Sequence, residues 1–230
     1  MKSARVGNQE NTQRMARQHL RNDPVMARLI TKYPDFDPRA WLSELPKMDA
    51  FGALVFQVIG QQISVQATRA IVERLRTLFR GKMPNPEQFL ATRPTRLRNV
   101  GLSNRKVATL RLVATRFIEE RLSLQKLKKL TDDEIVALLT SIPGIGPWTV
   151  QGFLVIALNR SDVVLPGDLA LRKAIRKNYD LSHLPSQDEV LEISQQWRPY
   201  RSLATAYLFQ SAFEAAKSRQ SPRSQRQGGR

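Results

Sequence analysis

Apolar residues along this chain recur at intervals of three and four positions and almost nowhere alternate with polar ones. This spacing places them on one face of a helix, so we expect an all-α fold. The segment 103–120 shows the pattern well, and Ser103 is suited to cap its N-terminus. The apolar face of this segment comprises Val107, Leu110, Ala114, Phe117 and Ile118. We predict further helices over 24–33, 49–59, 64–79, 132–140, 147–159, 168–178, 187–196 and 201–216.

The stretch SIPGIGPWTV at 141–150 interrupts what otherwise looks like one long helix. Upstream, Thr131 and Glu134 have the spacing of a capping box, which predicts that a helix begins there. The glycines of PGIG end that helix, and Pro147 is suited to the first position of the next one. The pattern therefore predicts a helix-hairpin-helix motif over 132–159.

The hairpin has a chemical use as well as a structural one. Gly144 and Gly146 lack a Cβ atom, so the free N–H groups at the start of the second helix are open to an anion such as a phosphate. The alternative is that PGIG is only a tight connection between two packed helices.

Charge favours the functional interpretation of this turn. The chain has 37 Lys and Arg against 20 Asp and Glu, a formal net charge of +17, which makes a polyanion the first partner to consider. A role in solubility alone is the alternative. We expect a flexible basic tail over 1–21, a globular domain over 22–216 and a disordered basic tail over 217–230.

Composition also excludes several classes of protein. The absence of cysteine rules out disulfides, thiolate zinc sites and cysteine-ligated iron–sulfur clusters, and two histidines make a histidine-rich metal site improbable. We expect no cofactor. No run is long enough to cross a membrane and no secretory signal is present, so we expect an intracellular protein without membrane contact.

A single acid stands out downstream of the hairpin. In DVVLPGDLAL, Pro166 and Gly167 break the chain immediately before Asp168, where a helical pattern begins. The structural interpretation is that Asp168 is an N-cap. A carboxylate at a helix start is also kept ionised by the N–H groups it faces and can stabilise a neighbouring cation.

These two motifs carry a family resemblance. IPGIGPWTV followed by DVVLPGDLAL resembles the helix-hairpin-helix DNA glycosylases, and FGALVFQVIGQQISVQAT at 51–68 and WRPYRSLATAYLF at 197–209 are similar to the 3-methyladenine DNA glycosylase II (alkylbase glycosylase) family. The resemblance covers roughly residues 22–213. It implies a two-lobed all-α glycosylase fold with the active-site cleft between the lobes.

The resemblance also implies site residues. Asp168 matches the catalytic aspartate. Gly144, Ile145 and Gly146, with Thr149, match the hairpin that holds a DNA phosphate, with a monovalent cation on the Ile142 and Ile145 carbonyls. Gln62, followed by Ser64, matches the residue that fills the gap left by the extruded base; the alternative is that Gln62 is a polar helix-start residue.

Aromatic residues are the expected lining of the base pocket, because stacking and cation–π attraction suit an electron-poor base. The candidates are Trp148, Trp41, Phe153, Tyr207 and Phe209. Aromatics at helical spacing are more often core residues, so we expect only two or three of them to face a pocket. Gly152 stands where some family members have an aromatic ring, which predicts a more open pocket.

The resemblance implies a monofunctional glycosylase of base excision repair. The enzyme would flip alkylated purines of the 3-methyladenine and 7-methylguanine type out of double-stranded DNA and leave an abasic site. Trp148 occupies the position of the nucleophilic lysine in bifunctional relatives, so we expect no lyase activity. We also expect a monomer, in the cytoplasm and nucleoid of a bacterium or the nucleus of a eukaryote. The alternatives are a non-catalytic helix-hairpin-helix DNA-binding protein or a glycosylase for oxidised or deaminated bases.

Overall fold

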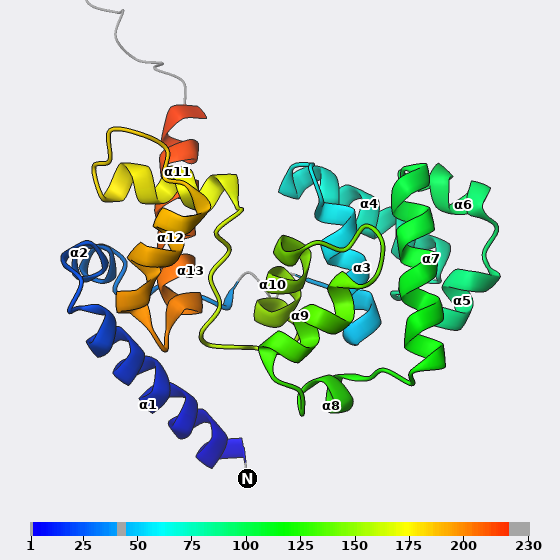
Figure 1. The fold of residues 1–230 in the computed structure, drawn as a ribbon, viewed down its shortest axis with the longest axis horizontal. Coiled ribbons are helices and arrows are strands. Elements are labelled where there is room, and N and C mark those ends of the chain that lie inside the picture. Colours follow the sequence, from blue (N-terminus) through cyan, green and yellow to red (C-terminus); the bar gives the residue numbers. More distant parts are fainter. Residues whose placement is uncertain (1, 41–44, 221–230) are drawn as a thin grey trace, which may run out of the picture. The chain divides into compact units, whose positions relative to one another are not determined.

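The structure is a computed structural model, and it describes the backbone of residues 2–40 and 45–220 and the side chains of residues 11–40 and 45–214. Throughout these ranges the regular structure is helical, as the spacing of apolar residues predicted. The chain divides into two compact units (Figure 1). Unit 1 combines residues 1–38 with 161–230, and unit 2 comprises residues 39–160.

Unit 2 is built around α3, Ala50–Gly60, whose residues are buried on nearly every side. Its neighbours are α4 (Val65–Leu78), α7 (Asn104–Glu119) and α10 (Pro147–Ile156). A helix that is apolar all round belongs at the centre of a core. The turns predicted in the proline-rich middle are the short helices α5 (Pro86–Ala91) and α6 (Pro94–Asn99), and α8 (Leu124–Leu127) follows α7.

The hairpin motif lies at the surface of this unit. Helix α9 spans Asp132–Thr140 and begins with the predicted capping box, in which Thr131 and Glu134 each bond the other's backbone N–H. The N–H of Thr131 donates to the Glu134 carboxylate, and this lowers the pKa of that side chain. Helix α10 follows after the PGIG turn and packs on α3 and α9 (Figure 1).

Unit 1 holds α2 (Pro24–Lys32), α11 (Leu169–Asn178), α12 (Gln187–Ile193), the 3-10 helix η2 (Ser194–Trp197) and α13 (Arg201–Gln220). A buried polar cluster ties them together. Asp23 caps α2 through Val25 N–H, and it also accepts bonds from the Tyr179 hydroxyl and from Trp197 Nε1 at 2.8 Å. Burial raises the pKa of Tyr179, with the Asp23 carboxylate adding to the effect.

The expected flexible tail over 1–21 is wrong in the structure. Helix α1 spans Lys2–Leu20, and Ala16 and Leu20 are buried. Arg17 Nη2 donates to the Phe36 carbonyl at 2.8 Å. Apolar contacts and bonds to the loop after α2 order this segment, a contribution that its polar composition concealed.

Other boundaries also differ from the predictions. Helix α13 continues to Gln220, so the tail predicted from 217 begins as helix, and 221–230 lie outside the described residues. Ile118, assigned to the buried face of α7, is 39% exposed near the helix end. Within the described ranges, no helix combines the length and apolar character that a bilayer crossing requires.

Candidate active site

Asp168 is held at the N-terminus of α11 in unit 1. It is the N-cap residue, and its Oδ1 accepts a hydrogen bond from the Leu171 N–H at 2.9 Å. The turn predicted from Pro166 and Gly167 is present, since Asp168 N–H donates to the Leu165 carbonyl at 3.0 Å. The side chain is half-buried. The positive end of the α11 dipole thus faces a carboxylate that keeps access to solvent.

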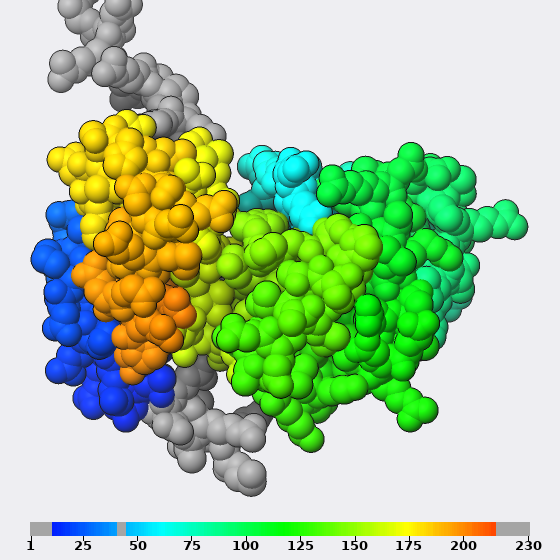
Figure 2. All heavy atoms as spheres, viewed as in Figure 1, coloured from blue at the N-terminus to red at the C-terminus, as the bar shows by residue number. Residues whose placement is uncertain are grey.

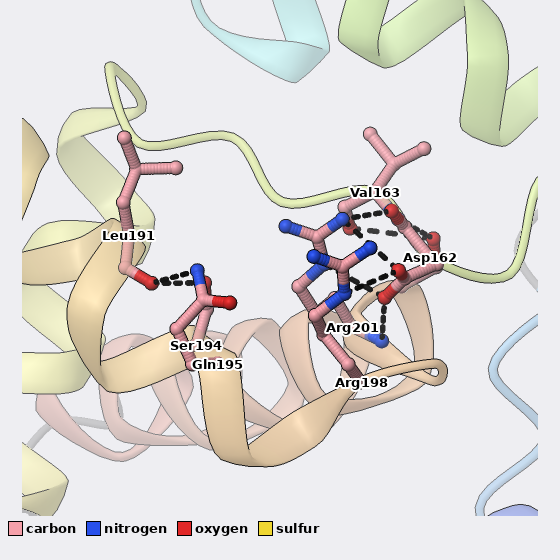
Figure 3. A network of polar contacts seen from close by, with 8 residues as sticks. Asp162, Val163, Leu191, Ser194, Gln195, Arg198 and Arg201 are labelled. Atoms are coloured by element: carbon pink, nitrogen blue, oxygen red, sulfur yellow. Dashed lines mark hydrogen bonds and ion pairs between the residues drawn. The ribbon is translucent and has the colours of Figure 1, made fainter.

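The segment carrying this acid is fastened to α13. Residues 161–168, which we name the strap, bring Asp162 against Arg201, and Figure 3 shows the two side chains converging. Arg201 Nε lies 2.7 Å from Asp162 Oδ1 and its Nη2 lies 3.0 Å from Oδ2, a bidentate pair. Arg198 reaches the same carboxylate at 3.2 Å.

Backbone contacts add to this attachment. The Ser202 hydroxyl accepts the Val163 N–H at 3.0 Å and donates to the Val163 carbonyl at 3.3 Å. Ser202 N–H in turn donates to the Ser161 carbonyl at 3.0 Å. The apolar residues of the strap, Val163, Val164 and Leu165, are buried. The strap is therefore fixed at one end by α13 and at the other by the cap of α11.

The turn that presents Arg198 is closed by its own bonds. Ser194 Oγ donates to the Leu191 carbonyl at 2.8 Å and Gln195 Nε2 donates to the same oxygen at 3.1 Å (Figure 3). These bonds occupy the end of α12 and lead the chain through η2 into α13. The sequence comparison with itself gave no sign of this arrangement, because Asp162 and Arg201 are 39 positions apart.

We expect Asp162→Ala to loosen the strap. Breaking the partly buried pair leaves Arg201 without its bidentate acceptor, which should lower the free energy of unfolding by about 1–3 kcal/mol. Thermal unfolding measures this loss. Asp35→Ala, at an exposed acid of the same unit, is the matched control and should change stability by less than about 0.5 kcal/mol. Equal stability of the two variants would contradict the role assigned to the pair.

The PGIG turn in unit 2 depends on a close approach to α7. Gly144 has φ +92°, and a Cβ atom at this position would lie 2.1 Å from Thr109 Oγ1. Thr109 Oγ1 donates to the Pro143 carbonyl at 3.2 Å, and Gln61 Nε2 donates to the Gly144 carbonyl at 3.1 Å. The turn is thus braced from two neighbouring helices.

The backbone N–H groups of the turn differ in availability. Ile145 is buried, and its N–H donates to the Ile142 carbonyl at 3.0 Å. Gly146, the N-cap of α10, contributes no side-chain cap, and within the described part of the chain no acceptor pairs with its N–H. An anion therefore has Gly144 and Gly146 to bind, and the inclusion of the Ile145 amide is wrong.

Thr149 also differs from its predicted role. Its side chain is 2% exposed, and its hydroxyl accepts Gln61 Nε2 at 2.9 Å. It therefore braces the turn from inside instead of contacting DNA. The Ile142 carbonyl keeps one lone pair beyond the bond from Ile145, so the predicted monovalent cation has an acceptor there. The described ranges contain no cluster of three or more His, Asp or Glu residues suited to hold a metal ion.

The turn between α3 and α4 projects Gln62 from unit 2. Gln62 is exposed and has φ +58°, in the left-handed region that is rare for residues other than glycine. Ser64 caps α4, with its hydroxyl accepting the Ala67 N–H at 3.2 Å. Ile63 and Val65 beside it are also exposed, and the cyan side chains of this turn and of early α4 reach the surface in Figure 2.

Lys106 on α7 fixes the base of this turn. Its Nζ donates to the Ile59 carbonyl at 2.8 Å and to the Gln61 carbonyl at 2.9 Å, at the C-terminal end of α3. Burial lowers the pKa of Lys106. The sequence analysis missed Lys106, Thr109 and Gln61; the one signal available was the appearance of polar residues next to apolar helix faces.

The aromatic candidates fall into two groups. Phe153 and Tyr207 have no exposed surface, so their prediction as pocket residues is wrong and they belong to the cores. Tyr207 packs edge-on against Phe36, and burial raises its pKa. Trp148 and Phe209 are half-buried and keep accessible surface. Trp41 lies outside the described residues.

Comparison with known proteins agrees with the fold and the motifs. Residues 55–199 match the HhH-GPD superfamily base excision DNA repair protein family. DNA-3-methyladenine glycosylase 1 of Schizosaccharomyces pombe is 31% identical over 192 residues, which is 83% of each chain. The DNA-3-methyladenine glycosylase of Saccharomyces cerevisiae is 30% identical over 183 residues, 75% of this chain and 62% of the yeast protein.

A solved structure gives the same result. The S. pombe 3-methyladenine DNA glycosylase Mag1 in complex with abasic DNA superposes with a TM-score of 0.80 at 30% identity, over 86% of this chain and 97% of Mag1. The matched region includes the α3–α4 turn, the hairpin and the strap that carries Asp168. This chain therefore belongs to the HhH-GPD superfamily of base excision DNA repair proteins.

Proposed function

We propose that this protein is a monofunctional DNA glycosylase that removes alkylated purines, of the 3-methyladenine and 7-methylguanine type, and leaves an abasic site. The observation that carries the proposal is Asp168, a half-buried carboxylate fixed at the N-terminus of α11 by a strap bonded to α13. The relatives named DNA-3-methyladenine glycosylase support the reaction class.

The reaction breaks the bond between C1′ of the sugar and the purine nitrogen through an oxocarbenium-like transition state. The bonding electrons leave with the base, and positive charge develops on the sugar. Asp168 stabilises that charge and orients the water that attacks C1′, and the proton of this water passes to the carboxylate or to solvent. A purine alkylated at N3 or N7 is already cationic and leaves as a neutral base, so the reaction requires little acid assistance.

DNA recognition follows from unit 2. Gly144 and Gly146 present the amides of the braced turn to a phosphate at the N-terminus of α10, and the net charge of +17 adds long-range attraction. Gln62, exposed in its strained turn, fills the gap left by the flipped nucleotide. Trp148 and Phe209, the half-buried aromatics, are the residues that stack on the extruded base. We propose double-stranded DNA as the partner of a monomeric enzyme.

The proposal excludes strand cleavage by a lysine. Trp148 occupies the hairpin position at which the resemblance places the lysine of bifunctional enzymes. Lys106, whose pKa is lowered by burial, is held by two backbone carbonyls of α3 and braces the turn. A Schiff base would require an amine released from such bonds.

Base release from methylated duplex DNA tests the proposal. We expect chromatography to detect free 7-methylguanine and 3-methyladenine, with the strand intact until alkali cleaves the abasic site. Borohydride added during the reaction should trap no covalent complex. DNA binding without any base release would identify a non-catalytic binding protein, and a trapped adduct would identify a glycosylase-lyase.

A further inference from the structure

Gln57 on α3 occupies the space that a side chain at position 152 would fill. A Cβ atom built on Gly152 would lie 2.4 Å from Gln57 Oε1, 2.8 Å from Cδ and 3.0 Å from Nε2. Gly152 is on α10, which packs against α3. The pocket that Gly152 was expected to open is therefore occupied at this point by a carboxamide.

This carboxamide is unusual for its location. The other buried residues of α3 are apolar or glycine, and Gln57 itself is 6% exposed. Within the described residues no donor or acceptor pairs with its amide, although buried polar groups are rarely left unpaired. The amide is also not one of the unpaired polar atoms that the described part of the chain seals from solvent, so it faces accessible space.

The position of the amide links it to the proposed base site. Trp148 and Gly152 are four residues apart on α10 and so share one face of that helix. The Gln57 amide lies over Gly152, one turn beyond the half-buried Trp148. A base stacked on Trp148 would have this amide beside its edge.

We propose that Gln57 is a specificity-determining residue whose carboxamide hydrogen-bonds the edge of the flipped purine and extends the substrate range to neutral deaminated purines. This inference rests on the proposed glycosylase function. The amide has one donor group and one acceptor group, so it matches an edge that carries both, such as the N1–H and O6 of hypoxanthine.

The chemistry of the leaving group gives the amide a selective effect. When the glycosidic bond of a neutral purine breaks, negative charge develops on the base, and an N–H group directed at it stabilises the transition state. A cationic alkylated purine becomes neutral as it leaves, so the same N–H contributes little. Loss of the amide should therefore slow neutral substrates more than cationic ones.

Single-turnover release of hypoxanthine and 7-methylguanine by the wild type and by Gln57→Met tests the inference. Methionine keeps the length and volume of glutamine without its hydrogen-bonding groups. We expect the variant to release hypoxanthine about 10- to 100-fold more slowly and 7-methylguanine less than about threefold more slowly. Gln125→Met, at an exposed glutamine of unit 2, is the control and should match the wild type.

The results separate the inference from the proposed function. If the wild type releases neither base, the proposed function fails. If it releases 7-methylguanine but no hypoxanthine, or if Gln57→Met slows both equally or neither, the inference is wrong and the proposed function stands. Should Gln57→Met fail to fold in thermal unfolding, Gly152→Ala gives the same test, because its Cβ displaces the amide, and it should also slow hypoxanthine selectively.

Discussion

Asp168→Asn should reduce the rate of base release from methylated DNA by at least about 10²–10³-fold, because the transition state loses the charge that stabilises the sugar cation. Asparagine caps helices about as well as aspartate, so the bond from the Leu171 N–H and the start of α11 should survive. Single-turnover kinetics with 7-methylguanine measures the rate. Affinity for abasic DNA should stay within about threefold of the wild type.

The control for this substitution separates the cap from the charge. Asp168→Ala removes both, so it should be as inactive as Asp168→Asn and also less stable by about 0.5–2 kcal/mol. Thermal unfolding of both variants distinguishes the two contributions. Retention of activity within tenfold by Asp168→Asn would show that the carboxylate is only a helix cap and would remove the basis of the proposed mechanism.

Gly144→Ala should destabilise the protein by about 2–4 kcal/mol and abolish specific DNA binding. Two costs combine: the residue keeps a positive φ that alanine adopts poorly, and the new Cβ would meet Thr109 Oγ1 at 2.1 Å. Because the turn must move to relieve this contact, the amides of Gly144 and Gly146 lose their arrangement. Denaturant unfolding and a fluorescence binding titration with abasic duplex measure the two effects.

Gly146→Ala is the matched control two positions away. Its Cβ would meet no atom within 4 Å and its φ is −106°, so its cost in stability should stay below about 1 kcal/mol. Adding Thr109→Ala to Gly144→Ala should recover part of the lost stability, since it removes Oγ1 but leaves the backbone strain. Equal stability of Gly144→Ala and Gly146→Ala would mean that the approach of Gly144 to α7 is not what forms the turn.

Helical spacing and capping chemistry were sufficient to place the helices around the site. Thr131 and Glu134 form the predicted capping box, Ser103 caps α7 and Asp168 caps α11. These signals depend on residues within four positions of one another, which is the range over which a helix determines its own ends. The error at the N-terminus, where α1 packs through Ala16 and Leu20, arose because polar composition does not reveal packing.

The same spacing could not sort the aromatic candidates. Trp148 and Phe153 lie on one helix, yet Trp148 is half-buried and Phe153 has no exposed surface. Periodicity tells which residues turn away from solvent, and it does not tell whether another helix covers them. Thr149, expected at the DNA, is turned inward for the same reason.

By itself, the sequence determined the helices, the hairpin, the capping aspartate and the excess of positive charge, because each depends on neighbouring residues or on composition alone. Only the tertiary structure decided which groups meet across long separations: Gln61 with Thr149 over 88 positions, Gly144 with Thr109, and Asp162 with Arg201. Gln57 beside Gly152 belongs to the same class. Such contacts form where α3, α7 and α10, or the strap and α13, pack together, and no local pattern encodes which side chains then face each other.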